Sequence, residues 1–196
     1  MSSTKLPHIV LASTSRYRAE LLRRLLPDFE QRAPDVDETP HPGEAPSERA
    51  ARLAADKARA VARQARDSLV IGSDQVAALD SDILRKPGDA ATAQAQLMRC
   101  SARTVMFHTA VCVVGPDAIE RHVMDTTGVH FRQLDQATIE RYILAEQPLD
   151  CAGSFKCEGL GIALFKRIEN DDPTALIGLP LIAVARLLRD CGVPLP

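Results

Sequence analysis

The sequence predicts an α/β fold, and two observations carry that prediction. Short apolar runs typical of buried strands alternate along the chain with longer segments of helical periodicity. The first run, HIVLA at 8–12, is followed at once by Ser13, Thr14 and Ser15, whose hydroxyls are suited to cap the start of a helix. The 196 residues fit one large domain or two small lobes that share a core. We expect a single domain over residues 1–196, because the sequence contains no clear interdomain linker.

The remaining elements follow from the spacing of apolar residues. The helix at about 16–26 is expected to bury four leucines on one face. The run LVIGSDQVAAL and the segment after it are expected to form two strands around a tight Asp-Ser-Asp turn. The predicted strands are 8–12, 29–33, 69–79, 83–86, 104–114 and about 120–132, and the predicted helices are about 16–26, 47–66, 89–100, 135–146 and 181–191.

Composition and charge narrow the function classes. Hydrophobic residues make up 45% and charged residues 26% of the chain, as in ordinary soluble globular proteins. The net charge of −2 gives no global field that would recruit nucleic acid or an anionic membrane. No apolar run approaches the roughly 20 residues of a membrane span, and the N-terminal one is too short for a secretory signal. The five cysteines form no C-x-x-C pair, which favours reduced thiols, so we expect a cytoplasmic protein without nucleic-acid or membrane partners.

The segment ASTSRYR, at the first strand-to-helix junction, is a candidate phosphate site. Hydroxyls and free backbone N–H groups at a helix start suit a phosphate, and Arg16 and Arg18 add positive charge. The alternative is an ordinary helix cap with solvated arginines.

The acidic segment APDVDE and a lysine on the next helix are further candidates. Glu38 and its acidic neighbours could bind a divalent cation, or they could form a solvated loop. Lys57 falls in the apolar stripe of the helix, four residues after Leu53. A lysine at such a position needs a charged partner, or it extends its ammonium to the surface.

Asp74 lies in an otherwise apolar strand, just after Gly72. A buried carboxylate must be paired, protonated or metal-bound. If Leu79 faces Ile83 across a three-residue turn, Asp74 and Lys86 share one face of the hairpin. A two-residue turn would place them on opposite faces, and a structural ion pair is the alternative to a catalytic site.

Taken in order, these segments resemble the Maf family of nucleoside triphosphate pyrophosphatases over nearly the whole chain. The matching segments are LASTSRYR, VDE, DKA, GSDQV, RKP, CAGSFKCEG and GLPL. The resemblance implies a mixed central sheet flanked by helices, and two lobes with a deep cleft. It also implies cytosolic enzymes that use a divalent metal, Mg²⁺ or Mn²⁺, to cut between the α and β phosphates. Arg16 stands where the family usually has proline, which leaves the detailed shape of that loop open.

The same resemblance implies roles for individual residues. Asp74 would be the proton acceptor, and Glu38 and Asp74 would bind the metal. Whether Asp74 takes the proton or chiefly holds the metal cannot be decided from the sequence. The motif-matched residues are Ser13 and Arg18 for phosphate binding, and Glu38, Lys57, Asp74 and Lys86 for catalysis.

Three further positions resemble the 7-methyl-GTP subgroup of the family: Tyr17, Gln75 and Glu158. The dTTP/UTP subgroup tends to have Arg, Thr and Gln there, and a dTTP/UTP or broad-specificity pyrophosphatase is the alternative. Glu158 is expected to accept hydrogen bonds from the base, and pairing with Lys156 is the competing role. A non-enzymatic cell-division regulator or partner-binding protein is the rival in another class. The sequence carries no information on oligomeric state, and a homodimer is compatible with it.

Overall fold

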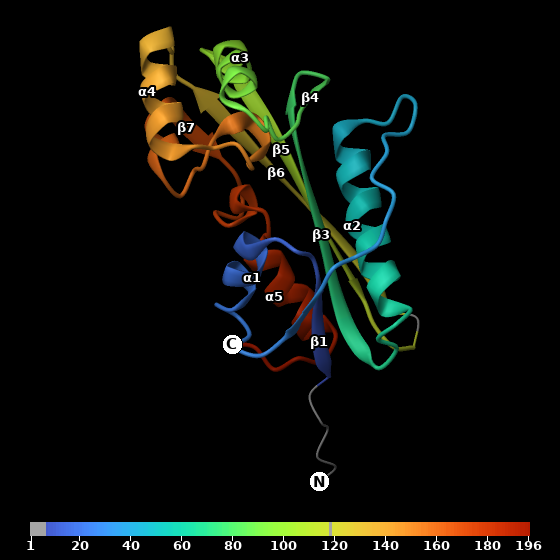
Figure 1. The fold of residues 1–196 in the computed structure, drawn as a ribbon. Coiled ribbons are helices and arrows are strands. Elements are labelled where there is room, and N and C mark those ends of the chain that lie inside the picture. The colour runs from blue at the N-terminus through green and yellow to red at the C-terminus, as the bar shows by residue number, and fades with distance from the viewer. Residues whose placement is uncertain (1–6, 118) are drawn as a thin grey trace. The chain divides into compact units, whose positions relative to one another are not determined.

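The computed structural model describes residues 7–117 and 119–196, which form two compact units (Figure 1). The first unit comprises Met1–Asp74, Thr109–Asp125 and Asp172–Pro196, and the second comprises Gln75–His108 and Thr126–Asp171. The boundary between the units therefore falls inside three strands of the sheet. The expectation of one domain with a deep cleft between two lobes stays a prediction.

The strands form a mixed sheet, as expected. In the described residues, six of the seven strands follow the order β2-β1-β3-β5-β6-β7, and the seventh, β4, pairs with β3. β1 is parallel to β2 and β3, whereas the β3–β4 and β6–β7 pairs are antiparallel. The strands are β1 His8–Ala12, β2 Glu30–Arg32, β3 Ser68–Leu79, β4 Asp82–Leu84, β5 Thr104–Val114, β6 Glu120–Phe131 and β7 Phe165–Glu169.

The helices begin where the sequence predicts but two of them end earlier. α1 ends at Leu22 rather than near 26, and its chain continues as a turn before Pro27. Ser15, Asp89 and Asp135 cap α1, α3 and α4 through their side-chain oxygens. The helices are α1 Arg16–Leu22, α2 Pro46–Ala62, α3 Ala90–Cys100, α4 Gln136–Glu146 and α5 Leu181–Asp190, with 3₁₀ turns η1 Ala152–Ser154, η2 Leu160–Leu164 and η3 Ala175–Ile177.

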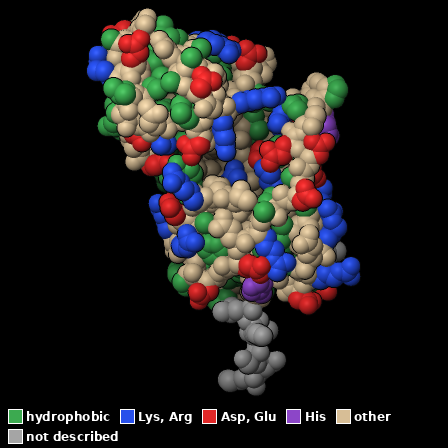
Figure 2. Space-filling model, viewed as in Figure 1, with side chains coloured by type: hydrophobic (Ala, Val, Ile, Leu, Met, Phe, Trp, Pro, Cys, Tyr) green, Lys and Arg blue, Asp and Glu red, His purple; other side chains and the backbone are tan. Residues whose placement is uncertain are grey.

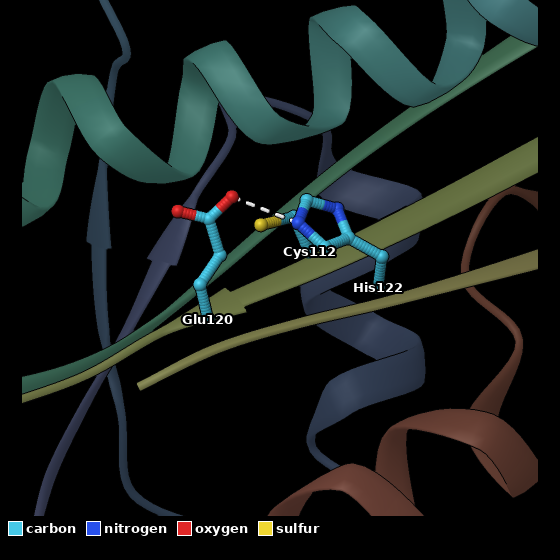
Figure 3. A group of neighbouring side chains, drawn as sticks. All are labelled: Cys112, Glu120 and His122. Carbon is cyan, nitrogen blue, oxygen red and sulfur yellow. Dashed lines mark hydrogen bonds and ion pairs between the residues drawn. The ribbon is translucent and has the colours of Figure 1, made fainter. Parts of the chain in front are cut away.

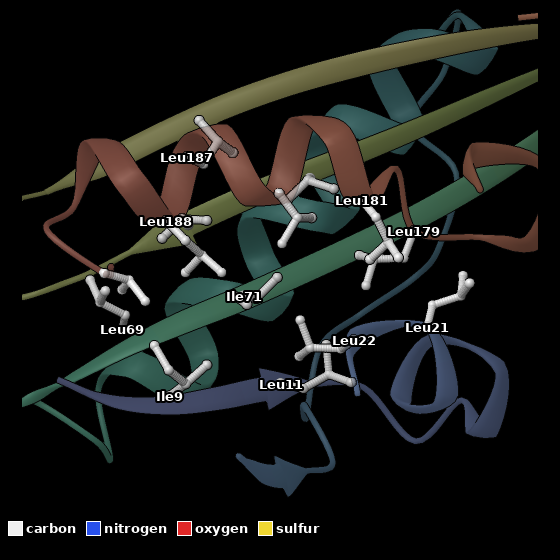
Figure 4. Packing of buried hydrophobic residues seen from close by; sticks show 14 of the residues in the cluster. Ile9, Leu11, Leu21, Leu22, Leu69, Ile71, Leu179, Leu181, Leu187 and Leu188 are labelled. Carbon is white, nitrogen blue, oxygen red and sulfur yellow. The ribbon is translucent and has the colours of Figure 1, made fainter. Parts of the chain in front are cut away.

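In the first unit, alternating residues of β1 enter two different cores. Ile9 and Leu11 pack with α1 and α5 on one face of the strand (Figure 4). Val10 and Ala12 pack with the end of α2 on the other face. The two-residue period of a strand produces this arrangement, so α2 and the α1–α5 pair cover opposite faces (Figure 1).

In the second unit, four phenylalanines form a connected cluster. Phe155 contacts Phe107, Phe131 and Phe165 edge to face, with ring centroids 4.8–5.6 Å apart. Such pairs contribute about 0.5–1.5 kcal/mol each beyond the burial of their area. Phe155 belongs to the segment CAGSFKCEGLG, residues 151–161, which we call the glycine-rich loop. The middle of that loop is therefore anchored in the core.

The surface and the cysteines match an ordinary globular chain. Figure 2 shows Lys and Arg side chains interspersed with Asp and Glu over the face in view. All five cysteines are free thiols, as expected. Among the helices of the described residues, none has both the length and the apolar character needed to cross a membrane.

Candidate active site

The period of β3 aims Asp74 at α2. Val70 packs against the end of α2, and Gly72 and Asp74 follow it at intervals of two, on the same face. Ser73 points the opposite way, and its hydroxyl donates to the carbonyl of Gly178 at 3.1 Å. A carboxylate is thus placed beneath a helix by the same alternation that builds the core.

Gly72 allows α2 to lie unusually close to β3. A Cβ at position 72 would lie 2.3 Å from the carbonyl oxygen of Ala54 and 2.6 Å from the amide nitrogen of Ala58. Any larger side chain would therefore push the helix away from the strand. The absent side chain therefore brings the same turn of α2, which carries Lys57 between Ala54 and Ala58, within reach of Asp74.

Lys57 binds two carboxylates rather than extending to the surface. Its Nζ donates to Oδ1 of Asp74 at 2.6 Å and lies 2.7 Å from Oε1 of Glu38. Lys57 and Asp74 are buried, whereas the side chain of Glu38 is 55% exposed. A buried ammonium is costly unless it is paired and hydrogen-bonded, and the two carboxylates meet that need. We call Lys57, Glu38 and Asp74 the Lys57 network.

Basic neighbours keep Glu38 ionised. Partial burial raises the pKa of its carboxyl, but the hydrogen bond and charge of Lys57, with Arg49 and Arg18, outweigh that effect and lower it. Arg49 also donates to the backbone carbonyl of Glu38 at 2.8 Å. The side chain and the main chain of Glu38 are thus both held by cations.

The donor chemistry of the network fits a hard divalent cation. Carboxylate oxygens are the ligands that Mg²⁺ and Mn²⁺ prefer. Oxygens of Glu38 and Asp74 already converge on one cationic group, the Lys57 ammonium. The exposure of Glu38 leaves its carboxylate accessible to an ion from solvent.

Arg18 links the start of α1 to the loop before α5. Its Nε donates to the carbonyl of Gly178 at 2.9 Å, and Nη1 donates to Oγ of Ser13 at 3.4 Å. Burial lowers the pKa of the guanidinium and the charges of Asp74 and Glu38 raise it, with a net lowering. Arginine nevertheless stays protonated in proteins, so this is a fixed cation beside a hydroxyl.

Ser13 is buried at the end of β1 and accepts from the backbone N–H of Ser15 at 3.1 Å. The predicted phosphate-binding pair, Ser13 and Arg18, is therefore in contact. The segment GLPL contributes through the backbone carbonyl of Gly178, which also accepts from Ser73. Sequence patterns could not identify that carbonyl, because every residue has one.

The hairpin settles which of the two turn lengths is present. Leu79 pairs with Asp82, so Asp80 and Ser81 form a two-residue turn. The three-residue turn, on which a shared face for Asp74 and Lys86 depended, is therefore excluded, and the two-residue alternative holds. Lys86 itself follows β4, which ends at Leu84. Lys86 is exposed in the second unit, and its catalytic role stays a prediction.

Two of the predicted specificity residues, Tyr17 and Gln75, are half-buried. The Arg16 guanidinium donates to the Tyr17 hydroxyl at 2.8 Å and lies 4.8 Å from the centre of the ring. Arg16, the departure from the family pattern, therefore forms a cation–π contact with this aromatic side chain.

Glu158, the third specificity residue, is exposed in the glycine-rich loop. The Cys157 thiol donates to its carboxylate at 3.4 Å. Lys156 instead donates to the backbone carbonyl of Glu146 at 3.0 Å, and its Nζ lies 3.9 Å from the Glu146 carboxylate. Lys156, two residues before Glu158, is therefore paired with Glu146 and not with Glu158.

A separate group in the first unit contains three potential metal ligands: Cys112, Glu120 and His122 (Figure 3). His122 Nε2 lies 2.8 Å from Glu120, and Arg59 donates to the same carboxylate at 2.6 Å. Burial raises the pKa of the Cys112 thiol to about 12, so it holds its proton. Because Arg59 already neutralises Glu120, we interpret Arg59, Glu120 and His122 as an ion-pair network beside the buried Cys112 thiol.

Comparisons with known proteins identify the family of the chain. The model of the Maf-like protein family matches residues 8–191, and the chain belongs to that family. A protein of Xanthomonas oryzae pv. oryzae called 7-methyl-GTP pyrophosphatase is 60% identical over 97% of this chain and 100% of the relative. Proteins with the same name from Xanthomonas campestris pv. campestris and Aromatoleum aromaticum are 57% and 54% identical over 97% and 96% of this chain, covering 100% and 97% of those relatives.

Solved structures with some similarity include the Ham1 protein of Staphylococcus aureus. It has 21% sequence identity and a TM-score of 0.46, covering 63% of this chain and 71% of that one. A Ham1 protein from Coxiella burnetii has the same identity and TM-score, covering 64% of this chain and 73% of that one.

Proposed function

We propose that the protein is a nucleoside triphosphate pyrophosphatase that hydrolyses 7-methyl-GTP to 7-methyl-GMP and diphosphate. The single observation that carries the reaction type is the Lys57 network, in which an ammonium holds two carboxylates at 2.6 and 2.7 Å. The substrate rests on the names of relatives 54–60% identical over nearly the whole chain. We also propose that the protein acts in the cytoplasm.

Hydrolysis at the α phosphorus requires an oriented water, neutralised phosphates and a stabilised leaving group. In the proposed reaction, Asp74 accepts a proton from water as the water oxygen bonds to the α phosphorus. The bond from that phosphorus to the bridging oxygen breaks, and diphosphate leaves. Lys57 fixes the orientation of the Asp74 carboxylate through the contact at 2.6 Å.

Other side chains bind the substrate. Ser13 supplies a hydroxyl, and Arg18 supplies a permanent cation, for the phosphates. Lys86 is assigned the same charge-neutralising role. A divalent cation held by Glu38 and Asp74 would neutralise phosphate charge and lower the pKa of water.

Base selection is assigned to Glu158, with Tyr17 and Gln75. Guanine offers N–H donors on its Watson–Crick edge, and a carboxylate can accept two of them. Methylation at N7 makes the base cationic and strengthens those donors, so a negatively charged partner favours the methylated form. The exposed Glu158 carboxylate, with Lys156 paired to Glu146, is available for this contact.

The test is a nucleotide panel with Mg²⁺ that contains 7-methyl-GTP, GTP, UTP and dTTP, scored separately for pyrophosphate and orthophosphate. We expect pyrophosphate from every substrate that is cut, the highest kcat/KM with 7-methyl-GTP, and loss of turnover in EDTA. Stepwise orthophosphate release, or full activity in EDTA, would overturn the reaction type. A preference for UTP or dTTP would support the alternative substrate class, and no turnover of any nucleotide would favour a non-enzymatic protein.

A further inference from the structure

The end of α4 holds the glycine-rich loop on both sides of Glu158. The backbone N–H of Leu160 donates to Oε2 of Glu146 at 2.7 Å. The backbone N–H of Lys156 donates to the Tyr142 hydroxyl at 3.0 Å, one helical turn earlier. These two hydrogen bonds fix the main chain two residues before and two residues after Glu158.

The side chain of Lys156 strengthens the same attachment. Its ammonium donates to the backbone carbonyl of Glu146 at 3.0 Å and lies 3.9 Å from the carboxylate of the same residue. The side chains of Lys156 and Glu146 are only 17% and 19% exposed, so solvent screens this contact less than it would a surface pair. Glu146 thus binds the loop through its main chain and its side chain together.

We call the contacts of Glu146 and Tyr142 with the loop the α4 clamp. Glycines allow the backbone of the loop to approach this clamp closely. A Cβ at Gly159 would lie 2.6 Å from Oε2 of Glu146, and a Cβ at Gly161 would lie 2.3 Å from the carbonyl oxygen of Lys156. The backbone next to Glu158 is therefore pressed against the Glu146 carboxylate. Glu158 itself is exposed, so its main-chain neighbours set where its carboxylate lies.

We propose that Glu146 is a positioning residue for base selection, because it fixes the loop backbone that carries Glu158. This inference rests on the proposed function, in which Glu158 recognises the methylated base. A carboxylate that must accept two hydrogen bonds from a planar base edge needs a fixed origin, because hydrogen bonds weaken steeply when their distances and angles depart from the preferred range. Glu146 acts through Glu158 and has no assigned contact with substrate.

Glu146→Ala tests the proposal, with Glu140→Ala as the matched control. Glu140 is an exposed glutamate on the same helix, where it accepts from Gln136 at 2.7 Å. We expect Glu146→Ala to raise KM for 7-methyl-GTP by about 10-fold, with kcat within about 2-fold and a smaller change for GTP. Glu146→Gln should restore much of the loss, because its amide oxygen can still accept from Leu160. Glu140→Ala should behave as wild type.

A double-mutant cycle separates positioning from a general loss of structure. If Glu146 acts through Glu158, the variant Glu146→Ala/Glu158→Gln should discriminate between 7-methyl-GTP and GTP no worse than Glu158→Gln alone. Fully additive losses, or an equal loss on both nucleotides, would overturn the inference.

Hydrogen exchange provides a readout that does not depend on activity. Glu146→Ala should accelerate exchange over 151–161 and leave the first unit unchanged, whereas unchanged exchange in the loop would reject the clamp itself. If wild type fails to prefer 7-methyl-GTP while the loop still loosens in Glu146→Ala, the clamp stands and the assigned base selection is wrong.

Discussion

Lys57 in the first unit and Lys156 in the second are both paired with acidic residues, but different kinds of structure hold them. Lys57 extends from α2 to Asp74 on β3, so regular elements fix both ends of the contact. Lys156 lies in an irregular loop, and Glu146 at the end of α4 receives it. Sites on regular elements hold geometry tightly, whereas loops vary without disturbing the sheet. In the proposed function, the Lys57 network accordingly carries catalysis, and Glu158 of the glycine-rich loop contributes to base choice.

The largest expected effect concerns the regular site. Asp74→Asn should lower kcat by about 10²–10⁴-fold on every nucleotide, because the amide cannot accept the proton of the attacking water. The amide oxygen can still accept from Lys57, so the fold should persist. Steady-state kinetics and thermal melting check this, and Asp28→Asn, at an exposed position outside the acidic segment, is the matched control. Near-normal turnover with an unchanged melting temperature would make Asp74 a structural residue.

The next effect concerns the loop. Glu158→Gln should lower kcat/KM for 7-methyl-GTP by about 10- to 150-fold, since charge-assisted hydrogen bonds contribute about 1.5–3 kcal/mol. The loss on GTP should be smaller, because GTP lacks the cationic base. Competition between the two nucleotides in one reaction measures the ratio directly. A loss of the same size on both would remove base selection from Glu158.

The smallest effect concerns the close approach that builds the Lys57 network. Gly72→Ala should destabilise the protein by about 1–3 kcal/mol, because its Cβ meets the backbone of α2 and separates Lys57 from Asp74. For a chain of this size, the melting temperature should fall by about 2–12 °C. Gly128→Ala is the control, since a Cβ there meets nothing closer than 3.7 Å. If both variants melt like wild type, α2 can move without cost and the packing argument is wrong.

The two regions also differ in how much of them could be predicted from the sequence. Helical spacing predicts Lys57 on the buried face of α2, and the surrounding apolar run predicts Asp74 in a buried strand; both residues are buried and paired. The mixed sheet follows from the family resemblance, the start of α1 from its capping hydroxyls, and the other helices from the spacing of their apolar residues. These features depend on periodic patterns that local sequence carries.

The contacts that periodicity does not encode were missed. Glu146 and Tyr142 hold the glycine-rich loop through its backbone, and no spacing rule links residues 14 apart across a helix end and a loop. The sequence does not determine the hairpin register, because the Asp-Ser-Asp segment allows two turn lengths. The structure adopts the shorter turn, with Asp80 at a φ of 56°. The sequence shows Gly72 beside Asp74, but only the structure shows that the missing side chain lets α2 pack closely against β3.

The most direct test compares the two regions in one experiment: kcat/KM of wild type, Asp74→Asn and Glu158→Gln on both 7-methyl-GTP and GTP. The division between catalysis and base choice predicts that Asp74→Asn loses activity by the same factor on both substrates. Glu158→Gln should instead lose the preference for 7-methyl-GTP while it keeps most of its turnover of GTP. An equal loss on both nucleotides in Glu158→Gln, or an unequal loss in Asp74→Asn, would contradict that division.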